Sequence, residues 1–154
     1  MKIKVIFMDV DGVLTDGKIN VDATGKELFK SFCSQDTVGI IKAQKAGLHV
    51  VWISAKESDI TRKRAESLGI KTVYISTEKG KKVEVFCAES GIAMTDACFI
   101  GDDDADIEAM RLVGCPIAVA NAVHDVKKAA LYITSRSGGY GAVREAIEYV
   151  LDRT

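Results

Sequence analysis

The chain has 154 residues and a mass of 16.6 kDa, which suits one domain of ordinary size. A hydrophobic fraction of 47% and a charged fraction of 28% are typical of a globular protein with a buried core. The 21 Lys and Arg and the 22 Asp and Glu leave a net charge of -1, so the basic surplus that a general nucleic-acid or membrane-surface binder needs is missing.

Short apolar runs alternate with longer amphipathic stretches along the chain. Five runs are each too short for a helix and predict buried strands at 3–8, 48–53, 72–75, 97–100 and 117–119. The amphipathic stretches predict helices at about 36–46, 57–68, 79–90, 103–113, 123–129 and 141–152. This alternation predicts an α/β fold with a doubly wound parallel sheet and helices on both of its faces.

One segment after the first strand interrupts the alternation. Residues 18–22 and 26–32 flank Ala23-Thr24-Gly25, which predicts a β-hairpin with glycine in its turn. The apolar side chains of this segment fall on more than one face, and a two-stranded hairpin is barely stable alone. We therefore expect the hairpin to pack against something else, such as another subunit.

The apolar stretches are too short to predict a membrane span or a signal peptide. The longest segment without Asp, Glu, Lys or Arg runs from 112 to 124, below the ~20 residues of a spanning helix. The apolar run near the N-terminus ends at Asp9. Four cysteines stand far apart without a Cys-x-x-Cys pair, which favours reduced, packed thiols over a disulfide framework or a zinc site. We expect a cytoplasmic protein with a single domain over residues 1–154.

Acidic residues gather where two of the predicted strands end. Asp9 and Asp11 follow the first strand, and Asp102, Asp103 and Asp106 follow the fourth. In a doubly wound sheet, ligands bind outside the carboxyl ends of the strands. Carboxylates that converge there stay ionised only if a cation neutralises them, and otherwise some of their pKa values must rise. Oxygen ligands at a phosphate-type site favour Mg²⁺.

Taken singly, these residues also have structural explanations. Acidic residues after strands are frequent helix caps, so Asp103 and Asp104 suit the start of the predicted helix at 103–113. Ser54, at the end of the second strand, matches a capping box together with Glu57. Their occurrence together, in order and each at a strand end, favours the functional interpretation.

Three segments carry a family resemblance. Residues 9–17 read D-V-D-G-V-L-T-D-G, residues 101–106 read G-D-D-D-A-D, and residues 138–145 read G-G-Y-G-A-V-R-E. With these segments the chain resembles the haloacid dehalogenase superfamily, in its small, cap-less branch: the 3-deoxy-D-manno-octulosonate 8-phosphate phosphatases and their nonulosonate 9-phosphate relatives. The resemblance covers essentially the whole chain, hairpin included, and implies a Rossmann-like domain without a cap.

The resemblance implies a Mg²⁺-dependent phosphomonoester hydrolase that works through an aspartyl-phosphate intermediate. Asp9 would attack phosphorus, and Asp11 would protonate the leaving sugar oxygen and later activate water. Asp9, Asp102 and the backbone carbonyl of Asp11 would hold the metal. Asp103 and Asp106 would support these ligands or add to them.

Ser54 and a lysine complete the implied catalytic set. Ser54 would donate a hydrogen bond to a phosphoryl oxygen, and the lysine would neutralise charge on the transferring group. The family places this lysine where the helix after the third strand begins, just before an apolar residue. Lys82 matches that position best and Lys81 second best. Basic residues are unfavourable at the N-terminus of a helix, so several lysines there indicate that an anionic group binds nearby.

The residues after Ser54 bear on the substrate. The usual Thr-Gly-Arg of the family is Ser54-Ala55-Lys56 here, which keeps a hydroxyl and a positive charge but loses the planar guanidinium. Relatives that act on nonulosonate 9-phosphates can carry an acidic residue at this place, so Lys56 favours the octulosonate substrate. Ala55, Lys56 and Arg144 are the expected substrate-binding residues, although Arg144 is equally well explained as the partner of Glu148 one helical turn away.

Other interpretations stay open. A nonulosonate 9-phosphate phosphatase is the main alternative. A non-catalytic oligomerisation or regulatory module of the same fold would be expected to lose Asp9 or the Gly-Asp-Asp motif, and this chain has both. A phosphoacceptor receiver domain needs an aspartate where Ser76-Thr77 stand, and a dehalogenase would have no use for Asp11. The family also implies a homotetramer, in which a neighbour's hairpin and tail enclose an otherwise open site. We expect a sugar-phosphate substrate and neither a nucleic-acid nor a membrane partner.

Overall fold

The computed structural model describes residues 2–154, and its strands build one parallel sheet. The strands are β1 (Val5–Met8), β2 (His49–Ser54), β3 (Thr72–Ile75), β4 (Ala97–Gly101), β5 (Cys115–Ala118) and β6 (Tyr132–Ile133). Their order is β3-β2-β1-β4-β5-β6, and every pairing is parallel. The chain thus starts at the centre, moves out to β3, and returns to β4 on the other side of β1.

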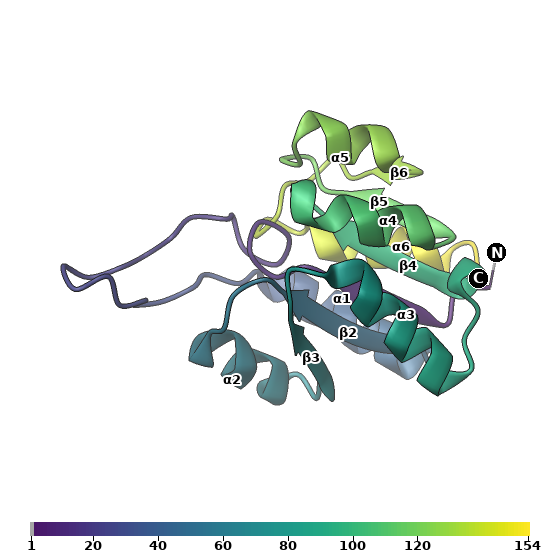
Figure 1. The fold of residues 1–154 in the computed structure, drawn as a ribbon, viewed down its shortest axis with the longest axis horizontal. Helices are drawn as coiled ribbons and strands as arrows, with labels where there is room; N and C mark the ends of the chain where they lie inside the picture. Colours follow the sequence, from purple (N-terminus) through teal and green to yellow (C-terminus); the bar gives the residue numbers. More distant parts are fainter. Residues whose placement is uncertain (1) are drawn as a thin grey trace.

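Helices cover both faces of this sheet, as the sequence predicts. They are α1 (Ser34–Lys45), α2 (Asp59–Ser67), α3 (Lys79–Ser90), α4 (Ile107–Leu112), α5 (His124–Ala129) and α6 (Ala142–Leu151). Figure 1 shows α3 and α4 in front of the sheet, with α1 and α6 behind it. The helices α1 and α6 pack on each other, and so do α3 and α4. Within residues 2–154, none of the helices has the length and apolar character needed to cross a membrane.

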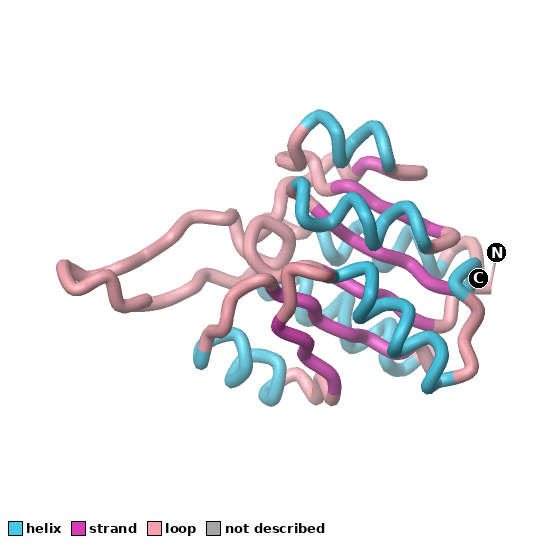
Figure 2. Tube along the Cα trace, in the orientation of Figure 1, coloured by secondary structure: helices cyan, strands magenta, loops and turns pink. Residues whose placement is uncertain are grey.

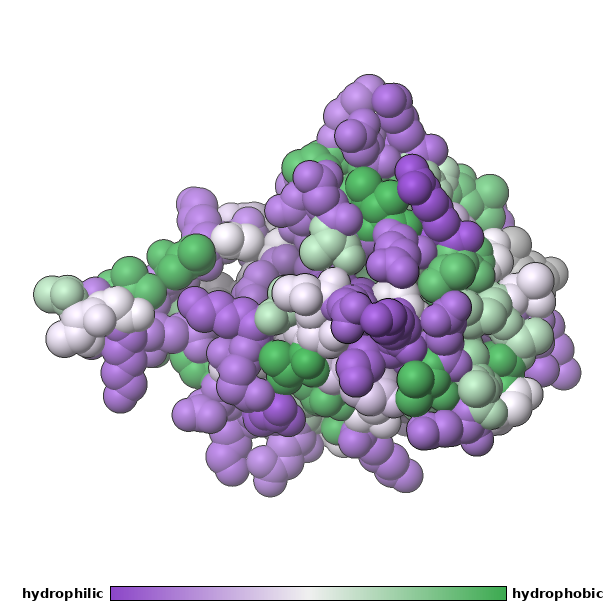
Figure 3. All heavy atoms as spheres, viewed as in Figure 1, coloured by the Kyte–Doolittle hydropathy of each residue, from purple (hydrophilic) through white to green (hydrophobic). Residues whose placement is uncertain are grey.

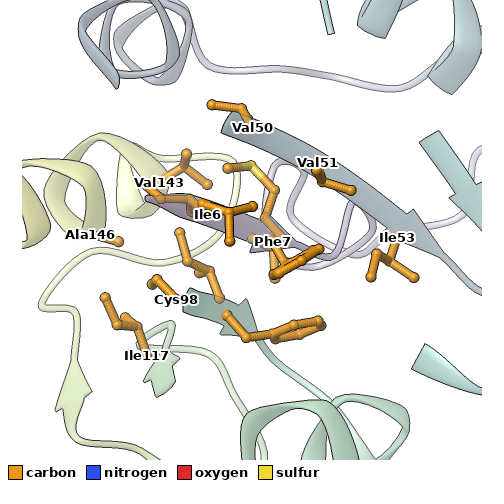
Figure 4. Packing of buried hydrophobic residues seen from close by; sticks show 14 of the residues in the cluster. Ile6, Phe7, Val50, Val51, Ile53, Cys98, Ile117, Val143 and Ala146 are labelled. Atoms are coloured by element: carbon orange, nitrogen blue, oxygen red, sulfur yellow. The ribbon is translucent and has the colours of Figure 1, made fainter. Parts of the chain in front are cut away.

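The core lies on both sides of the central strands. All four side chains of β1 are fully buried, because helices cover both faces of the sheet. A strand buried on both faces needs apolar residues at every position, so β1 is an unbroken apolar run in the sequence. Figure 4 shows Ile6 of β1 grouped with Cys98 of β4 and with Val143 and Ala146 of α6. The four cysteines of the chain are free thiols.

The structure departs from the predicted elements in three places. β6 is not predicted, because two residues paired along one edge leave no periodic signal. The helix predicted at 103–113 begins only at Ile107, because a 3₁₀ helix, η2 (Asp104–Asp106), precedes it with Asp103 as its cap. The predicted capping box of Ser54 and Glu57 is wrong. Ser58 caps α2 by accepting a hydrogen bond from the Thr61 backbone N–H at 3.2 Å.

The predicted hairpin is present as a long antiparallel loop. Its one bridge pairs Val21 with Glu27, next to a hydrogen bond from the Leu28 N–H to the Asn20 carbonyl at 2.8 Å. Gly25 takes the predicted turn position with a φ of +82°. Figure 2 shows the loop extending away from the sheet at the left of the view.

Candidate active site

The two central strands bring the predicted carboxylates together. β1 and β4 are neighbours, and Asp9 and Asp102 stand directly after them. The chain order reverses between these two strands, which is where a doubly wound sheet opens a crevice for ligands. Carboxylate oxygens of Asp9, Asp102 and Asp106 all lie within 4.8 Å of one another. The predicted convergence on one sheet edge is therefore confirmed.

A tight loop after β1 presents this edge. The backbone N–H groups of Val13, Leu14 and Thr15 all donate to the carbonyl of Val10, which closes the chain into a turn. Gly12 has a φ of +85°, and a Cβ at this position would lie 1.9 Å from Oδ2 of Asp102. Only glycine allows this backbone to approach the Asp102 carboxylate so closely.

The tail motif at 138–145 secures the same loop. A Cβ on Gly138 would lie 2.0 Å from the carbonyl oxygen of Gly12, so glycine is required for this contact. Asn121 ties the two segments together. Its Nδ2 donates to the Gly12 carbonyl at 3.0 Å, and its Oδ1 accepts from the Gly138 N–H at 2.7 Å. Sequence analysis did not single out Asn121, because no motif surrounds it.

The lysine beside the nucleophile candidate is Lys79. Its Nζ lies 3.1 Å from Oδ1 of Asp9 and 2.7 Å from Oδ1 of Asp106, and its side chain is fully buried. The predicted Lys82 instead places its Nζ 5.5 Å from the centre of the Tyr74 ring, and Lys81 pairs with Glu78. The prediction that Lys82 or Lys81 lies beside the carboxylates is therefore wrong in this structure.

Helical periodicity explains the correction. The buried face of α3 consists of Lys79, Gly80, Val83, Phe86 and Cys87, so Lys79 shares a face with the apolar residues four, seven and eight positions later. Lys82 lies off this face. A lysine in register with an apolar stripe must find a buried anion, and this signal in the sequence could have identified Lys79.

Asp106 holds the cluster together, whereas Asp103 mainly caps the turn. Oδ1 of Asp106 accepts from Lys79, and its Oδ2 accepts from the N–H groups of Asp102 at 2.9 Å and Asp103 at 3.3 Å. Both oxygens of Asp106 are thus engaged. Asp103 is exposed and accepts from the Asp104 N–H at 2.8 Å, which agrees with the structural explanation considered for it.

The carboxylates repel one another strongly. Burial, and then the charge of Asp106, raise the pKa of Asp9 to about 6, although Lys79 acts in the opposite direction. Burial, followed by the charges of Asp9 and Asp106, raises the pKa of Asp102 to about 9. Burial lowers the pKa of Lys79, but the same carboxylates outweigh it, and the net shift is upward. One ammonium does not neutralise three carboxylates, so the site favours a further cation.

The residues present fit a divalent metal ion. Oδ1 of Asp102 is buried and has no hydrogen-bond partner within residues 2–154, which is a costly state for a carboxylate oxygen unless it binds a cation. Asp9 and Asp102 supply hard oxygen ligands of the kind that Mg²⁺ prefers. Both oxygens of Asp106 already accept hydrogen bonds, so its place is to orient the other two.

Two of the remaining predicted residues, Asp11 and Lys56, line a cavity near the cluster. Its volume is about 370 Å³, and its lining includes Asp11, Lys30, Lys56 and the hairpin residues Ile19 and Val21. Asp11 and Lys30 both line this cavity, and the Lys30 ammonium lies 2.8 Å from Oδ1 of Asp11.

The segment after β2 places the residues predicted at 54–56. Ser54 is buried at the end of the strand and donates its hydroxyl to the Lys56 carbonyl at 3.1 Å. Ala55 and Lys56 are exposed just beyond it. Lys56 lines the same cavity as Asp11, and Ser54 ends the strand that pairs with β1, so this segment joins the sheet edge to the cavity.

Arg144 lies away from the carboxylate cluster. Its backbone N–H donates to Oδ1 of Asp36 at 2.9 Å, and its guanidinium pairs with Glu148, as in the structural explanation weighed for it. Arg144 and Glu148 line a separate polar hollow of about 470 Å³ together with Gln35 and Arg136. Within one copy of the chain, Arg144 is thus a packing residue between α6 and α1.

Comparisons with known proteins identify the family of the chain. A family model described as haloacid dehalogenase-like hydrolase matches residues 50–147. The chain is 38% identical over 150 residues to the 3-deoxy-D-manno-octulosonate 8-phosphate phosphatase of Haemophilus influenzae, covering 97% of this chain and 83% of that one. A cobalt-bound structure of the Haemophilus influenzae phosphatase matches with a TM-score of 0.94 at 38% identity, covering 98% of this chain and 88% of that one.

A second solved structure contains ligands. It is the 3-deoxy-D-manno-octulosonate 8-phosphate phosphatase of Moraxella catarrhalis in complex with magnesium, phosphate and KDO. The match has a TM-score of 0.93 at 34% identity and covers 97% of this chain and 86% of that one. The similarity therefore extends over nearly the whole chain, including the strand ends that carry Asp9 and Asp102.

Proposed function

The chain belongs to the haloacid dehalogenase-like hydrolases, in the family of the 3-deoxy-D-manno-octulosonate 8-phosphate phosphatases, and we propose that it is a Mg²⁺-dependent phosphatase of that sugar phosphate. The observation that carries the proposal is the cluster of Asp9, Asp102 and Asp106 around the buried ammonium of Lys79. A phosphoryl-transfer site needs a nucleophile, a cation and a means to offset the charge of the transferring group, and this cluster offers all three.

In this mechanism, Asp9 is the nucleophile and Asp11 the acid and base. A carboxylate oxygen of Asp9 forms a bond to phosphorus while the bond from phosphorus to the sugar oxygen breaks. Asp11 transfers its proton to the departing oxygen, which leaves as an alcohol. Water then attacks phosphorus and gives a proton to Asp11. The bond between phosphorus and the Asp9 oxygen breaks in this step, so that inorganic phosphate is released and the carboxylate of Asp9 is regenerated.

Neighbouring residues orient the reaction. Asp9, Asp102 and the backbone carbonyl of Asp11 would hold Mg²⁺, which supplies positive charge to the carboxylates and the phosphoryl oxygens when bound. Lys79 would offset charge on the transferring group, and Asp106 fixes Lys79 through its 2.7 Å contact. Ser54 exchanges its bond to the Lys56 carbonyl for one to a phosphoryl oxygen.

The cavity beside Asp11 supports an acidic sugar as the leaving group. At about 370 Å³ it can take a sugar of this size, and Lys56 contributes a cation that suits a carboxylate. The same lysine favours the octulosonate over the nonulosonate 9-phosphates, the alternative substrate class. A non-catalytic module is the remaining alternative, and the paired burial of Lys79 and Asp106 argues against it.

We place the active enzyme in a homotetramer in the cytoplasm. The projecting loop exposes apolar side chains that water disfavours, with Ile19 79%, Leu28 56% and Phe29 53% exposed. Figure 3 shows apolar surface gathered on this projection. A neighbouring subunit that covers these side chains would also narrow the open mouth of the cavity and exclude water from the reaction.

Phosphate release tests the proposal directly. The wild-type chain is incubated with octulosonate 8-phosphate and with a nonulosonate 9-phosphate, with Mg²⁺ or with chelator. Asp9→Asn is the test variant and Asp125→Asn, on the exposed surface of α5, the matched control. We expect Mg²⁺-dependent release, fastest from the octulosonate, that Asp9→Asn abolishes and Asp125→Asn leaves intact. Release from neither sugar would contradict the proposal and favour a non-catalytic module.

A further inference from the structure

Lys30, on the returning side of the hairpin, is buried in an otherwise exposed segment. Its side chain is 7% exposed, whereas the neighbouring Phe29 is 53% exposed. The Lys30 ammonium lies 2.8 Å from Oδ1 of Asp11, 3.0 Å from Oγ1 of Thr61 and 3.4 Å from Oε1 of Glu27. An ammonium has three donors, so these three oxygens use all of them.

The contacts of Lys30 anchor the hairpin at one place. Thr61 belongs to the first turn of α2, and Glu27 also accepts a 2.6 Å hydrogen bond from Ser58, the cap of that helix. The base of the loop is therefore joined to α2 through Glu27 and Lys30. Asp11 contacts this anchor through its Oδ1, which accepts the hydrogen bond from Lys30.

This arrangement treats the two oxygens of Asp11 differently. The Asp11 side chain is 45% exposed, and within residues 2–154 its Oδ2 has no hydrogen-bond partner. An ammonium only donates, so the oxygen that faces it must be an acceptor. The contact with Lys30 thus commits Oδ1 as an acceptor and leaves Oδ2 as the oxygen that can exchange a proton with the substrate.

We propose that Lys30 is a positioning residue for the acid and base of the reaction: it fixes the rotamer of Asp11 and directs Oδ2 toward the leaving oxygen. The inference rests on the proposed phosphatase activity and adds to it a role for the hairpin. An unheld, half-exposed Asp would sample several rotamers, and proton transfer requires the acid within hydrogen-bond reach of the leaving group. The hairpin thereby takes part in the chemistry through one buried lysine.

Leaving-group dependence tests this role. An alkyl phosphate needs a proton on its leaving oxygen, whereas p-nitrophenolate leaves readily without one. Values of kcat/KM for octulosonate 8-phosphate and for p-nitrophenyl phosphate are compared in wild type, Lys30→Met, Lys30→Arg and the control Lys26→Met. Lys26 is exposed at the tip of the same loop and lines no part of the cavity. If wild type does not hydrolyse the octulosonate, the alkyl phosphate that it hydrolyses fastest replaces it.

We expect Lys30→Met to lower kcat/KM for the alkyl phosphate on the order of 100-fold, the usual contribution of general acid catalysis. Its kcat/KM for p-nitrophenyl phosphate should stay near that of wild type, which also shows that the variant is folded. Lys30→Arg should recover part of the loss, because a guanidinium also donates to Oδ1, and Lys26→Met should match wild type.

Two other outcomes would overturn the inference. Equal losses for both substrates would mean that Lys30 only supports binding or folding, and no loss for either would mean that Asp11 needs no partner. Failure of the phosphatase proposal looks different, because wild type itself would then release phosphate from neither substrate.

Discussion

The carboxylate cluster and the hairpin differ in how the chain holds them. Asp9 and Asp102 stand at the ends of two central strands, and the cluster they form with Asp106 is fixed by Lys79 and by backbone N–H groups. The hairpin has a single bridge, between Val21 and Glu27, and joins the rest of the chain through Glu27 and Lys30 at its base. One region is built by the core, and the other extends away from it.

This contrast separates two tasks. Phosphoryl transfer requires groups fixed within fractions of an ångström, and strand ends in a packed sheet provide that precision. Substrate enclosure and assembly need a surface that other molecules complete, and an exposed apolar loop provides it. We expect substitutions in the cluster to affect chemistry and stability together, and substitutions of the exposed apolar side chains of the hairpin to affect assembly more than the stability of the protomer.

The largest effect should follow from removing the buried lysine. In Lys79→Met, Asp9 and Asp106 lose their shared cation inside the protein, which should lower the free energy of unfolding by about 3 kcal/mol. Loss of charge stabilisation should also lower kcat by roughly 10²–10³-fold. Denaturant unfolding and steady-state kinetics measure the two effects.

Lys82→Met is the matched control for that variant. Lys82 only covers the Tyr74 ring, so its removal should change the free energy of unfolding by less than about 0.5 kcal/mol and leave kcat near wild type. If Lys82→Met were the damaging variant, the assignment of Lys79 to the phosphate site would be wrong.

Mg²⁺ should stabilise the cluster, and more so at high pH. The pKa values of Asp9, about 6, and Asp102, about 9, both lie above the ordinary 3.8 of an aspartate. Without metal, the folded chain therefore binds more protons than the unfolded chain between about pH 3.8 and pH 9. The free energy of unfolding therefore falls as pH rises through this range. Because Mg²⁺ binds the ionised carboxylates, the rise in Tm that it causes should be larger at pH 9 than at pH 6.

At a Mg²⁺ concentration 100 times its Kd, the gain should be about 2.7 kcal/mol. Thermal unfolding with Mg²⁺ or with chelator at both pH values measures it. Asp102→Asn should abolish the shift, whereas Asp103→Asn should keep it, because Asp103 is an exposed cap. A shift that persists in Asp102→Asn would place the metal elsewhere.

The smallest effect on the single chain should come from the exposed apolar side chains of the hairpin. Replacing Ile19 and Phe29 by serine removes exposed apolar surface, so the free energy of unfolding of the protomer should change by less than about 0.5 kcal/mol per site. The predicted tetramer should dissociate, because the contact between neighbours loses its apolar area. Light scattering coupled to size exclusion measures the mass.

Leu131→Ser provides the control, since Leu131 is similarly exposed, at 54%, but lies outside the hairpin. This variant should keep the wild-type mass. A hairpin variant that stays tetrameric would show that another surface holds the subunits together.

The sequence by itself determined the fold class, the strand ends that carry Asp9, Asp11, Ser54 and Asp102, and the presence of the hairpin. These features follow from local signals: apolar runs of strand length, the acidic residues directly after them, and glycine at a turn. Such local patterns can be recognised in the sequence without knowing which elements pack against them. The parallel sheet with helices on both faces follows from the same alternation, whereas the strand order is known only from the structure.

Tertiary structure decided which side chains meet. The lysine beside Asp9 is Lys79 and not the predicted Lys82, because the sheet beneath α3 determines which face of the helix is buried. Asn121 and Lys30 reach Gly12 and Asp11 across 109 and 19 residues of sequence, and no local pattern records such contacts. Residue types and their order are properties of the chain, whereas the partner of a buried charge is set only when the core closes around it.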